Sequence, residues 1–174
     1  MKLISFMCMS LISLFSCASS GKADPEDGVI TEAMWNRVAV IDYSFGDASV
    51  VPEYHRSYEI QVTKTDAHIR IHSYGTVVFE QTYTIKPAQW QKVIDNLKKL
   101  NIRHWEVSAE PCDGGQSEYF AFKSAVKTEQ PIFTGSQDTC GNSNVDVGFE
   151  AVSQALDAAF PKPIGELVNA TIVQ

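Results

Sequence analysis

The sequence predicts one α+β domain, in which two helices pack on one face of an antiparallel sheet of about six strands. Between residues 57 and 85, apolar side chains recur at every second position, which is the period of a half-buried strand. Between residues 87 and 100 the period becomes that of an amphipathic helix. The elements follow in the order β-β-β-β-α-β-β-α, and runs of strands before each helix are typical of α+β domains.

Four strands are predicted before the first helix, at residues 36–45, 58–62, 67–72 and 77–85. Turns at 64–66 and at Tyr74–Gly75 separate the last three strands. Such short connections predict an antiparallel meander with one buried face and one wet face. Four apolar residues are expected to share one face of the fourth strand: Val77, Phe79, Tyr83 and Ile85.

The first helix is predicted over residues 87–100. Pro87 suits the first helical turn, because the amide N–H that proline lacks would have no partner there. Asn101 can adopt the left-handed conformation that ends a helix, and Ile102 would then fold back as its hydrophobic contact. The apolar face consists of Trp90, Val93, Ile94, Leu97 and Leu100.

Two strands and a second helix are predicted in the rest of the chain. Residues 119–123 and 131–134 form short strands, and Pro131 should lie at a strand start or an edge because it cannot donate to a ladder. Asn144 is expected to cap the second helix, which ends at Pro161. This helix carries Phe149, Val152, Leu156 and Phe160 on its apolar face.

Residues 1–16 have the layout of a secretory signal: Lys2 is followed by an apolar run that ends at Phe15. A membrane-spanning helix needs about 20 apolar residues, so this run is too short to be a stable anchor. The residues Leu14-Phe15-Ser16-Cys17 resemble the lipobox of bacterial lipoproteins, in which cleavage occurs just before the cysteine. The resemblance implies a diacylglycerol on Cys17 and a lipid-anchored place in the cell envelope.

The resemblance extends to location and domain organisation. The layout of the chain is similar to that of Gram-negative envelope lipoproteins, and Ala18 in place of aspartate implies the outer membrane. Ordinary signal cleavage near residues 18–20 is the alternative, and it would give a soluble periplasmic or secreted protein. Residues 17–33 are then the lipidated cysteine and a flexible tether, and residues 34–174 form the single domain.

The charge of the chain excludes some partners. The formal net charge is −7, whereas nucleic acid requires a basic surface, so no nucleic-acid partner is expected. The same charge disfavours adhesion of the protein surface to anionic lipid, which leaves the lipid anchor as the membrane contact. The acidity suits solubility, or a basic partner. No motif indicates a cofactor.

Cys112 and Cys140 are predicted to form a disulfide, because an even pair of cysteines in an exported domain is typical of one. A catalytic thiol is the alternative. It would need an electropositive setting, and Asp113 beside Cys112 opposes that.

His68, Arg70 and His72 project from one face of the third strand and are a possible ligand face. Positions i and i+4 of a strand lie about 13 Å apart, too far for both imidazoles to bind one zinc ion. A cationic row for an anionic ligand remains one interpretation, and a solvated strand face is the other.

Two further patterns are interpreted as turns or caps. Asn142, Asn144 and Asp146 match the start of a calcium loop, but Val147 occupies the glycine position and the later glutamate is missing. We therefore expect no metal site. Ser124 and Lys127 have the spacing of a serine–lysine catalytic pair, but they fall between two short strands and without companion motifs.

Two functional hypotheses follow. The first is a non-enzymatic envelope lipoprotein that acts as a binding, accessory or inhibitory module for an envelope protein or a small ligand. The second is a small envelope hydrolase, in which His55, His68 or His104 is the base and a carboxylate its partner. An exposed apolar patch would favour the first hypothesis, and a deep pocket with a His–carboxylate pair would favour the second.

Overall fold

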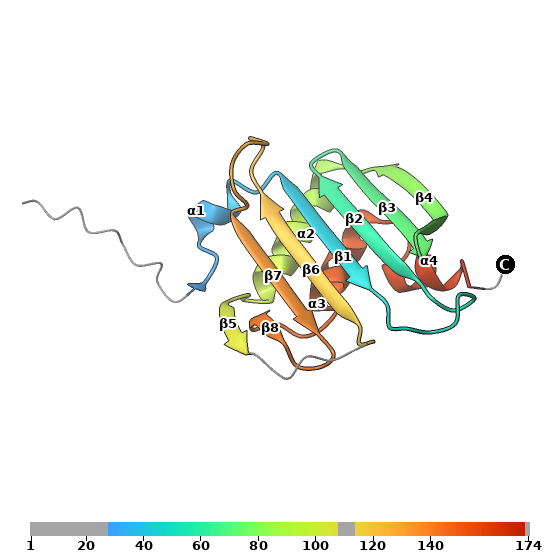
Figure 1. The fold of residues 1–174 in the computed structure, drawn as a ribbon. Coiled ribbons are helices and arrows are strands. Elements are labelled where there is room, and N and C mark those ends of the chain that lie inside the picture. Colours follow the sequence, from blue (N-terminus) through green and yellow to red (C-terminus); the bar gives the residue numbers. More distant parts are fainter. Residues whose placement is uncertain (1–27, 108–113, 173–174) are drawn as a thin grey trace, which may run out of the picture.

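One antiparallel sheet carries the fold in this computed structural model, which describes residues 28–107 and 114–172. Within these residues the sheet has eight strands in the order β4-β3-β2-β1-β6-β7-β8-β5 (Figure 1). The strands are β1 (Val40–Gly46), β2 (Ser57–Thr63), β3 (Asp66–Ser73), β4 (Thr76–Thr84), β5 (His104–Val107), β6 (Ser117–Lys123), β7 (Phe133–Asp138) and β8 (Ser143–Val145). The two halves of the chain meet where β1 pairs with β6.

Helices cover one face of this sheet and leave the other face open (Figure 1). The described helices are α1 (Glu32–Trp35), α2 (Pro87–Lys99), α3 (Ala151–Leu156), the 3-10 helix η2 (Asp157–Ala159) and α4 (Ile164–Asn169). Alternate residues of β1, Ile41, Tyr43 and Phe45, are buried on the helix side, and the residues between them face outward. The α+β class, the antiparallel sheet and the one-sided helical layer are as predicted.

The predicted first helix forms as α2. The amide of Lys86 donates to Oε1 of Gln89 at 3.0 Å, which caps the start of the helix. Val93, Ile94 and Leu97 are buried against the sheet. Asn101 has φ of +50°, and Ile102 is only 2% exposed. The left-handed residue is therefore confirmed, and the residue after it is buried in the core.

The number of elements was underestimated. The edge strand β5 and its neighbour β8 are short, and alternation over so few residues gives no periodic signal. Asn144 was wrongly expected to cap a helix: it lies in β8, where its Oδ1 accepts from the amide of Ser136 at 2.7 Å. The helix begins only at Ala151, and the short helices α1 and α4 were not predicted.

The face assigned to Val77 was also wrong. The register between β3 and β4 shifts, so that Ile71 pairs with Phe79 and His72 pairs with Val77. The extra residue in this bulge is Val78, and a one-residue insertion moves the preceding side chain to the opposite face. Phe79 and Tyr83 pack against the core as expected, while Val77 is 40% exposed.

The packed core begins before residue 34, because Ile30 and Trp35 are buried and the Trp35 ring lies 5.1 Å from that of Phe122. The first described residues join the sheet at the β5 edge, where Val29 forms a bridge with Arg103. No helix in residues 28–107 and 114–172 has the length and apolar character to cross a membrane.

Candidate functional site

The open face carries a row of hydroxyl groups across three neighbouring strands. In the sheet register, Ser44 of β1 lies opposite Tyr119 of β6, and Tyr119 lies opposite Ser136 of β7. Neighbouring strands are about 4.8 Å apart, so three hydroxyl side chains follow one another along one line. The next line on this face contains Gly46, Ser117 and Asp138.

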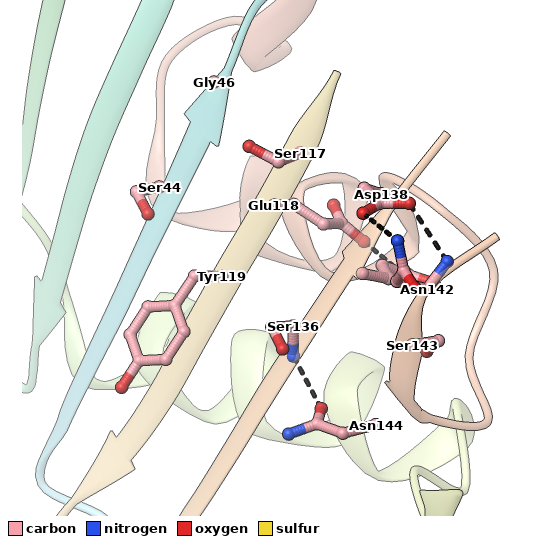
Figure 2. A pocket seen from close by; sticks show the side chains of 11 residues that line it. Ser44, Gly46, Ser117, Glu118, Tyr119, Ser136, Asp138, Asn142, Ser143 and Asn144 are labelled. Atoms are coloured by element: carbon pink, nitrogen blue, oxygen red, sulfur yellow. Dashed lines mark hydrogen bonds between the residues drawn. The ribbon is translucent and has the colours of Figure 1, made fainter. Parts of the chain in front are cut away.

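These two lines form the walls and floor of an open cavity of about 750 Å³, here called the hydroxyl groove (Figure 2). The small residues leave the space, and the ring of Tyr119 stands at its side with 44% exposure. A second hollow of about 400 Å³, lined by residues of β1, β2 and β3, shares Ser44 and Tyr119 with the groove. The groove is lined by Ser44, Gly46, Ser117, Glu118, Tyr119, Ser136, Gln137, Asp138, Asn142, Ser143 and Asn144.

A buried carboxylate lies beneath the groove. Glu118 is 2% exposed, and it accepts from the Tyr43 hydroxyl at 2.7 Å and from the Glu150 amide at 3.0 Å. The side-chain amide of Gln137 is a third donor. Burial raises the pKa of the Glu118 carboxyl above its ordinary value. The three hydrogen-bond donors lower this pKa, but their effect is smaller than that of burial. The donors come from β1, β7 and the start of α3, so Glu118 ties the sheet to the helical layer.

The second carboxylate of the groove is also satisfied internally. Asp138 accepts from the amides of Cys140 and Asn142 at 2.9 and 3.0 Å, and from the Asn142 side chain at 2.8 Å (Figure 2). These donors, the Asn142 side chain first among them, lower the pKa of Asp138. By contrast, no hydrogen bond from the side-chain hydroxyls of Ser44, Ser117, Tyr119 or Ser136 is found among the described residues.

A second surface lies at the end of the sheet where β1 turns into β2. Six exposed apolar or aromatic residues define it, and we call it the apolar end. Tyr54 is 63% exposed, Val51 57% and Tyr74 56%. The full set is Val50, Val51, Tyr54, Tyr74, Val77 and Val78.

Hydrogen bonds fix the loop of residues 47–56 that carries half of the apolar end. Asp47 accepts from the amides of Ala48 and Arg56 at 2.8 and 2.9 Å. The Ser73 hydroxyl donates to the carbonyl of Pro52 at 2.9 Å, and the Tyr74 hydroxyl donates to that of Val50. The loop is therefore attached both to its own base and to the β3–β4 turn.

Arg56 joins this loop to the segment after α4. Arg56 is only 8% exposed. Its Nε donates to the Thr171 hydroxyl at 2.8 Å. Nη2 donates to the Thr171 carbonyl at 2.6 Å, and Nη1 donates to the carbonyl of His55 at 2.6 Å. A buried guanidinium with this set of acceptors holds the 47–56 loop and the segment after α4 in one arrangement.

His55 does not have the geometry of a general base. The amide of Tyr74 donates to Nδ1 at 3.3 Å, so in the neutral ring the proton lies on Nε2. Nε2 is the atom that faces the Ser57 hydroxyl, at 3.4 Å. An Nε2 that already carries a proton cannot accept one from Ser57. The ring instead stacks on Tyr74 at 4.0 Å and supports the loop.

The predicted ligand face lies on the outer side of β3, next to an acidic residue of β4. Nε2 of His68 is 3.1 Å from Oε1 of Glu80, and Nε of Arg70 is 4.0 Å from the same oxygen. An anion approaching these side chains would therefore meet a carboxylate. Nδ1 of His72 is buried and has no hydrogen-bond partner within residues 28–107 and 114–172.

The remaining sequence candidates take structural positions. His104 is exposed and stacks on Phe133 at 4.3 Å. The Ser124 hydroxyl donates to Glu129 at 2.7 Å within a turn. In the described part of the chain no three His, Cys, Asp or Glu residues are grouped as metal ligands would be. Cys17 and Cys112 lie outside the described residues, so lipidation and the pairing with Cys140 stay predictions.

Sequence reasoning missed both surfaces described here. Ser44 and Tyr119 fell within two predicted strands, but the sequence did not reveal that these strands are neighbours in register. No protein-family model, curated protein or solved structure matches the chain.

Proposed function

We propose that the protein is a non-enzymatic, lipid-anchored binding module of the bacterial cell envelope, which docks a partner protein through the apolar end. The observation that carries the proposal is a set of six exposed apolar and aromatic residues gathered around one fixed loop. Contiguous exposed apolar surface in a soluble domain marks interaction sites, and tyrosine is enriched among residues that dominate binding energy.

The fixed loop supports tight docking. Ordering a flexible loop on binding opposes association. Here the Asp47, Ser73, Tyr74 and Arg56 hydrogen bonds already hold the loop in place. Val51 and Tyr54 are therefore presented without a further ordering step.

The position of the apolar end supports a partner located away from the membrane. Val77 and Val78 lie on β4, and Val29 lies beside β5. These strands form opposite edges of the sheet (Figure 1). Seven strand spacings correspond to about 34 Å. A lipid on Cys17 would precede Val29, and Val77 and Val78 lie at the edge of the sheet opposite these first described residues.

The partner is expected to be a protein with an apolar surface flanked by basic residues. The chain has a net charge of −7, and the exposed Glu53 lies in the loop that carries half of the apolar end. Opposite charge at the rim of an interface accelerates association and suppresses wrong partners. The edge strand β4 also offers the partner backbone groups with which to pair.

The hydrolase hypothesis receives less support. Within the described residues, the ion pairs include one between a histidine and a carboxylate, that of His68 with Glu80. Both side chains are more than one third exposed, and His68 borders only the shallow second hollow. The geometry of a water-excluding catalytic pocket is therefore not present at this pair.

The test places a photo-crosslinking amino acid at position 54 in the full chain in native cells. The matched control places it at position 105, because Trp105 is 58% exposed but lies in β5, at the opposite edge. We expect one protein adduct from position 54 and none from position 105. The purified partner should then bind the wild-type chain and lose about tenfold in affinity with Tyr54→Ala.

Equal adducts from both positions, or a partner whose affinity is unchanged by Tyr54→Ala, would contradict docking through the apolar end. Anchoring is tested separately by intact mass. The mature chain should carry the mass of a diacylglycerol on Cys17, and Cys17→Ser should lose that mass and leave the membrane fraction. A wild-type mass without lipid would favour ordinary signal cleavage.

A further inference from the structure

The hydroxyl groove is distinct from the apolar end, both in position and in chemistry. It lies on the open face over β1, β6 and β7, and its exposed groups are hydroxyls, amides and one aromatic ring (Figure 2). We propose that this groove binds a neutral saccharide. The proposal goes beyond docking of a partner protein and uses none of the residues of the apolar end.

The charges of the groove exclude an anionic ligand. Among the described residues, its lining contains the carboxylates of Glu118 and Asp138 and no lysine, arginine or histidine. A phosphate, carboxylate or sulfate group would therefore meet two acidic groups without a compensating cation.

The same two carboxylates create no demand for a cationic ligand. Glu118 is buried and accepts from Tyr43, Gln137 and Glu150, and Asp138 accepts from the amides of Cys140 and Asn142. A carboxylate with several donors of this kind is already stabilised in the protein. The groove is thus suited to an uncharged ligand.

The hydroxyls supply the hydrogen bonds that such a ligand needs. Each hydroxyl of Ser44, Ser117 and Ser136 can donate one hydrogen bond and accept two. Sugar hydroxyls can also both donate and accept, so either the serine hydroxyl or the sugar hydroxyl can be the donor of each hydrogen bond. Asn144 adds a donor, because its Oδ1 is held by the Ser136 amide at 2.7 Å while its Nδ2 remains directed away from that bond (Figure 2).

Tyr119 supplies an apolar surface for the C–H face of a sugar ring. Its ring is 44% exposed and stands between the groove and the second hollow, which both include Tyr119 in their lining. An aromatic ring combines a large apolar face with a polar hydroxyl at its end. Because there is space on both sides of the ring, the geometry points to an oligosaccharide rather than to a single sugar.

The size and rigidity of the groove suit such a ligand. Its volume of about 750 Å³ lies within the range of small-molecule sites, about 300–1,000 Å³. Ser44, Tyr119 and Ser136 are held in register by three paired strands. The Glu118 hydrogen bonds support β6 from below, so the hydroxyls are positioned before any ligand binds.

The experiment titrates two uncharged probes, N-acetylchitotetraose and maltotetraose, into the full mature chain by isothermal titration calorimetry. The detergent is a non-glycosidic amine oxide, because sugar-headed detergents would compete. We expect saturable binding of at least one probe below about 10 mM. Tyr119→Ala should weaken it about tenfold, and Tyr119→Phe, which retains the ring, by less than about threefold.

The matched control is Tyr54→Ala, which removes an exposed tyrosine from the apolar end and should leave saccharide binding unchanged. Thermal unfolding of each variant separates loss of binding from loss of fold. Three results would overturn the proposal: no saturable binding of either probe, binding that survives Tyr119→Ala, or preference for an anionic uronic-acid tetramer. Failure of saccharide binding would leave the crosslinking test of the apolar end unaffected, since the two experiments use different residues.

Discussion

At the scale of the residue, Glu118 is a carboxylate enclosed between the sheet and the helical layer. Its three donors come from Tyr43, Gln137 and the backbone of Glu150, so the side chain is satisfied although it is buried. Burial also raises the pKa of the Tyr43 phenol, and the neighbouring carboxylate reinforces the effect. The pKa of Tyr58, on the same side of the sheet, is raised to about 12 for the same main reason.

The raised pKa of Glu118 gives a prediction with a defined sign. The folded state binds the proton more tightly than the unfolded state, whose carboxyl has a pKa of 4.5. The free energy of unfolding therefore falls as the pH rises from 4.5 through the folded pKa. Glu118→Gln removes this term, so the stability of the variant relative to wild type should increase between pH 4 and pH 8 in urea denaturation.

Glu129→Gln is the matched control, because the Ser124 hydroxyl and Arg37 lower the pKa of Glu129. That contribution is present above pH 4.5 and lost as the pH falls, so this variant should lose stability relative to wild type as the pH rises. Identical pH profiles for the two variants would contradict the assignment of Glu118 as a buried, destabilised carboxylate.

Gly135 is required by close packing within the sheet. A Cβ atom built at this position would lie 2.1 Å from Cζ of Phe120, and Phe120 is fully buried. We expect Gly135→Ala to lower the free energy of unfolding by about 1–3 kcal/mol, because the ring cannot move without displacing its neighbours. Gly165→Ala is the control, since nothing lies within 4 Å of its Cβ position. Thermal and urea unfolding should give a lower stability for Gly135→Ala than for Gly165→Ala. Equal stabilities of the two variants would contradict the packing explanation.

At the scale of the element, the start of α3 is strained. Glu150 precedes the helix with φ of +60°. This left-handed conformation is unfavourable for any residue that has a Cβ atom. Its amide donates to Glu118, which holds the backbone in place. This strained cap explains why the helix begins at Ala151 although its apolar pattern is visible from Phe149 onward.

We expect Glu150→Gly to raise the free energy of unfolding by about 1 kcal/mol, because glycine adopts positive φ without strain and keeps the amide donor. The matched control is Glu166→Gly in α4, where glycine should lower it by about 1 kcal/mol through lost helix propensity. Opposite signs in urea denaturation are the expected result. Destabilisation by both substitutions would show that the Glu150 side chain contributes more than the strain.

Elements with long periodic patterns were predictable, and short ones were not. The repeat from Trp90 to Leu97 identified α2, and the alternation in residues 57–73 identified β2 and β3. By contrast, β8 has three residues and β5 has four, so pairing with neighbours rather than pattern creates them. Asn144 could not be assigned from sequence, because the side chain of an asparagine can accept a backbone N–H either as a helix cap or within a strand.

At the scale of the whole molecule, a covalent link is predicted between the segment that joins β5 to β6 and the turn that precedes β8. Closing the loop between Cys112 and Cys140 should stabilise the fold by about 3.5 kcal/mol in the chain-entropy treatment. The free energy of unfolding of the native chain should therefore fall by about that amount in reductant. A Cys112→Ser, Cys140→Ser double variant should have the lower value and no response to reductant. An equal response of both proteins would rule out the link.

The two proposed surfaces divide the molecule by function. The apolar end is formed by the β1–β2 loop, the β3–β4 turn and part of the edge strand β4, and the hydroxyl groove lies on the open face over β1, β6 and β7. Tyr54 and Tyr119 are exposed aromatic residues on the two surfaces. Substituting each in turn allows protein docking and saccharide binding to be separated within one chain.

The sequence by itself determined the class of fold, the order of the long elements, the end of α2 at Asn101 and the expectation of export. Each of these properties depends on residues close together in the chain: the local conformational preferences, the period of the apolar residues, or the composition of the first segment. They can therefore be read from the sequence without knowing which distant residues come into contact. Only the tertiary structure decided that β1 and β6 are neighbours, which aligns Ser44, Tyr119 and Ser136, and that the β1–β2 loop meets the β3–β4 turn. Contacts between residues 75 positions apart depend on the packing of the whole chain, as for Tyr43 and Glu118, so no local pattern encodes them.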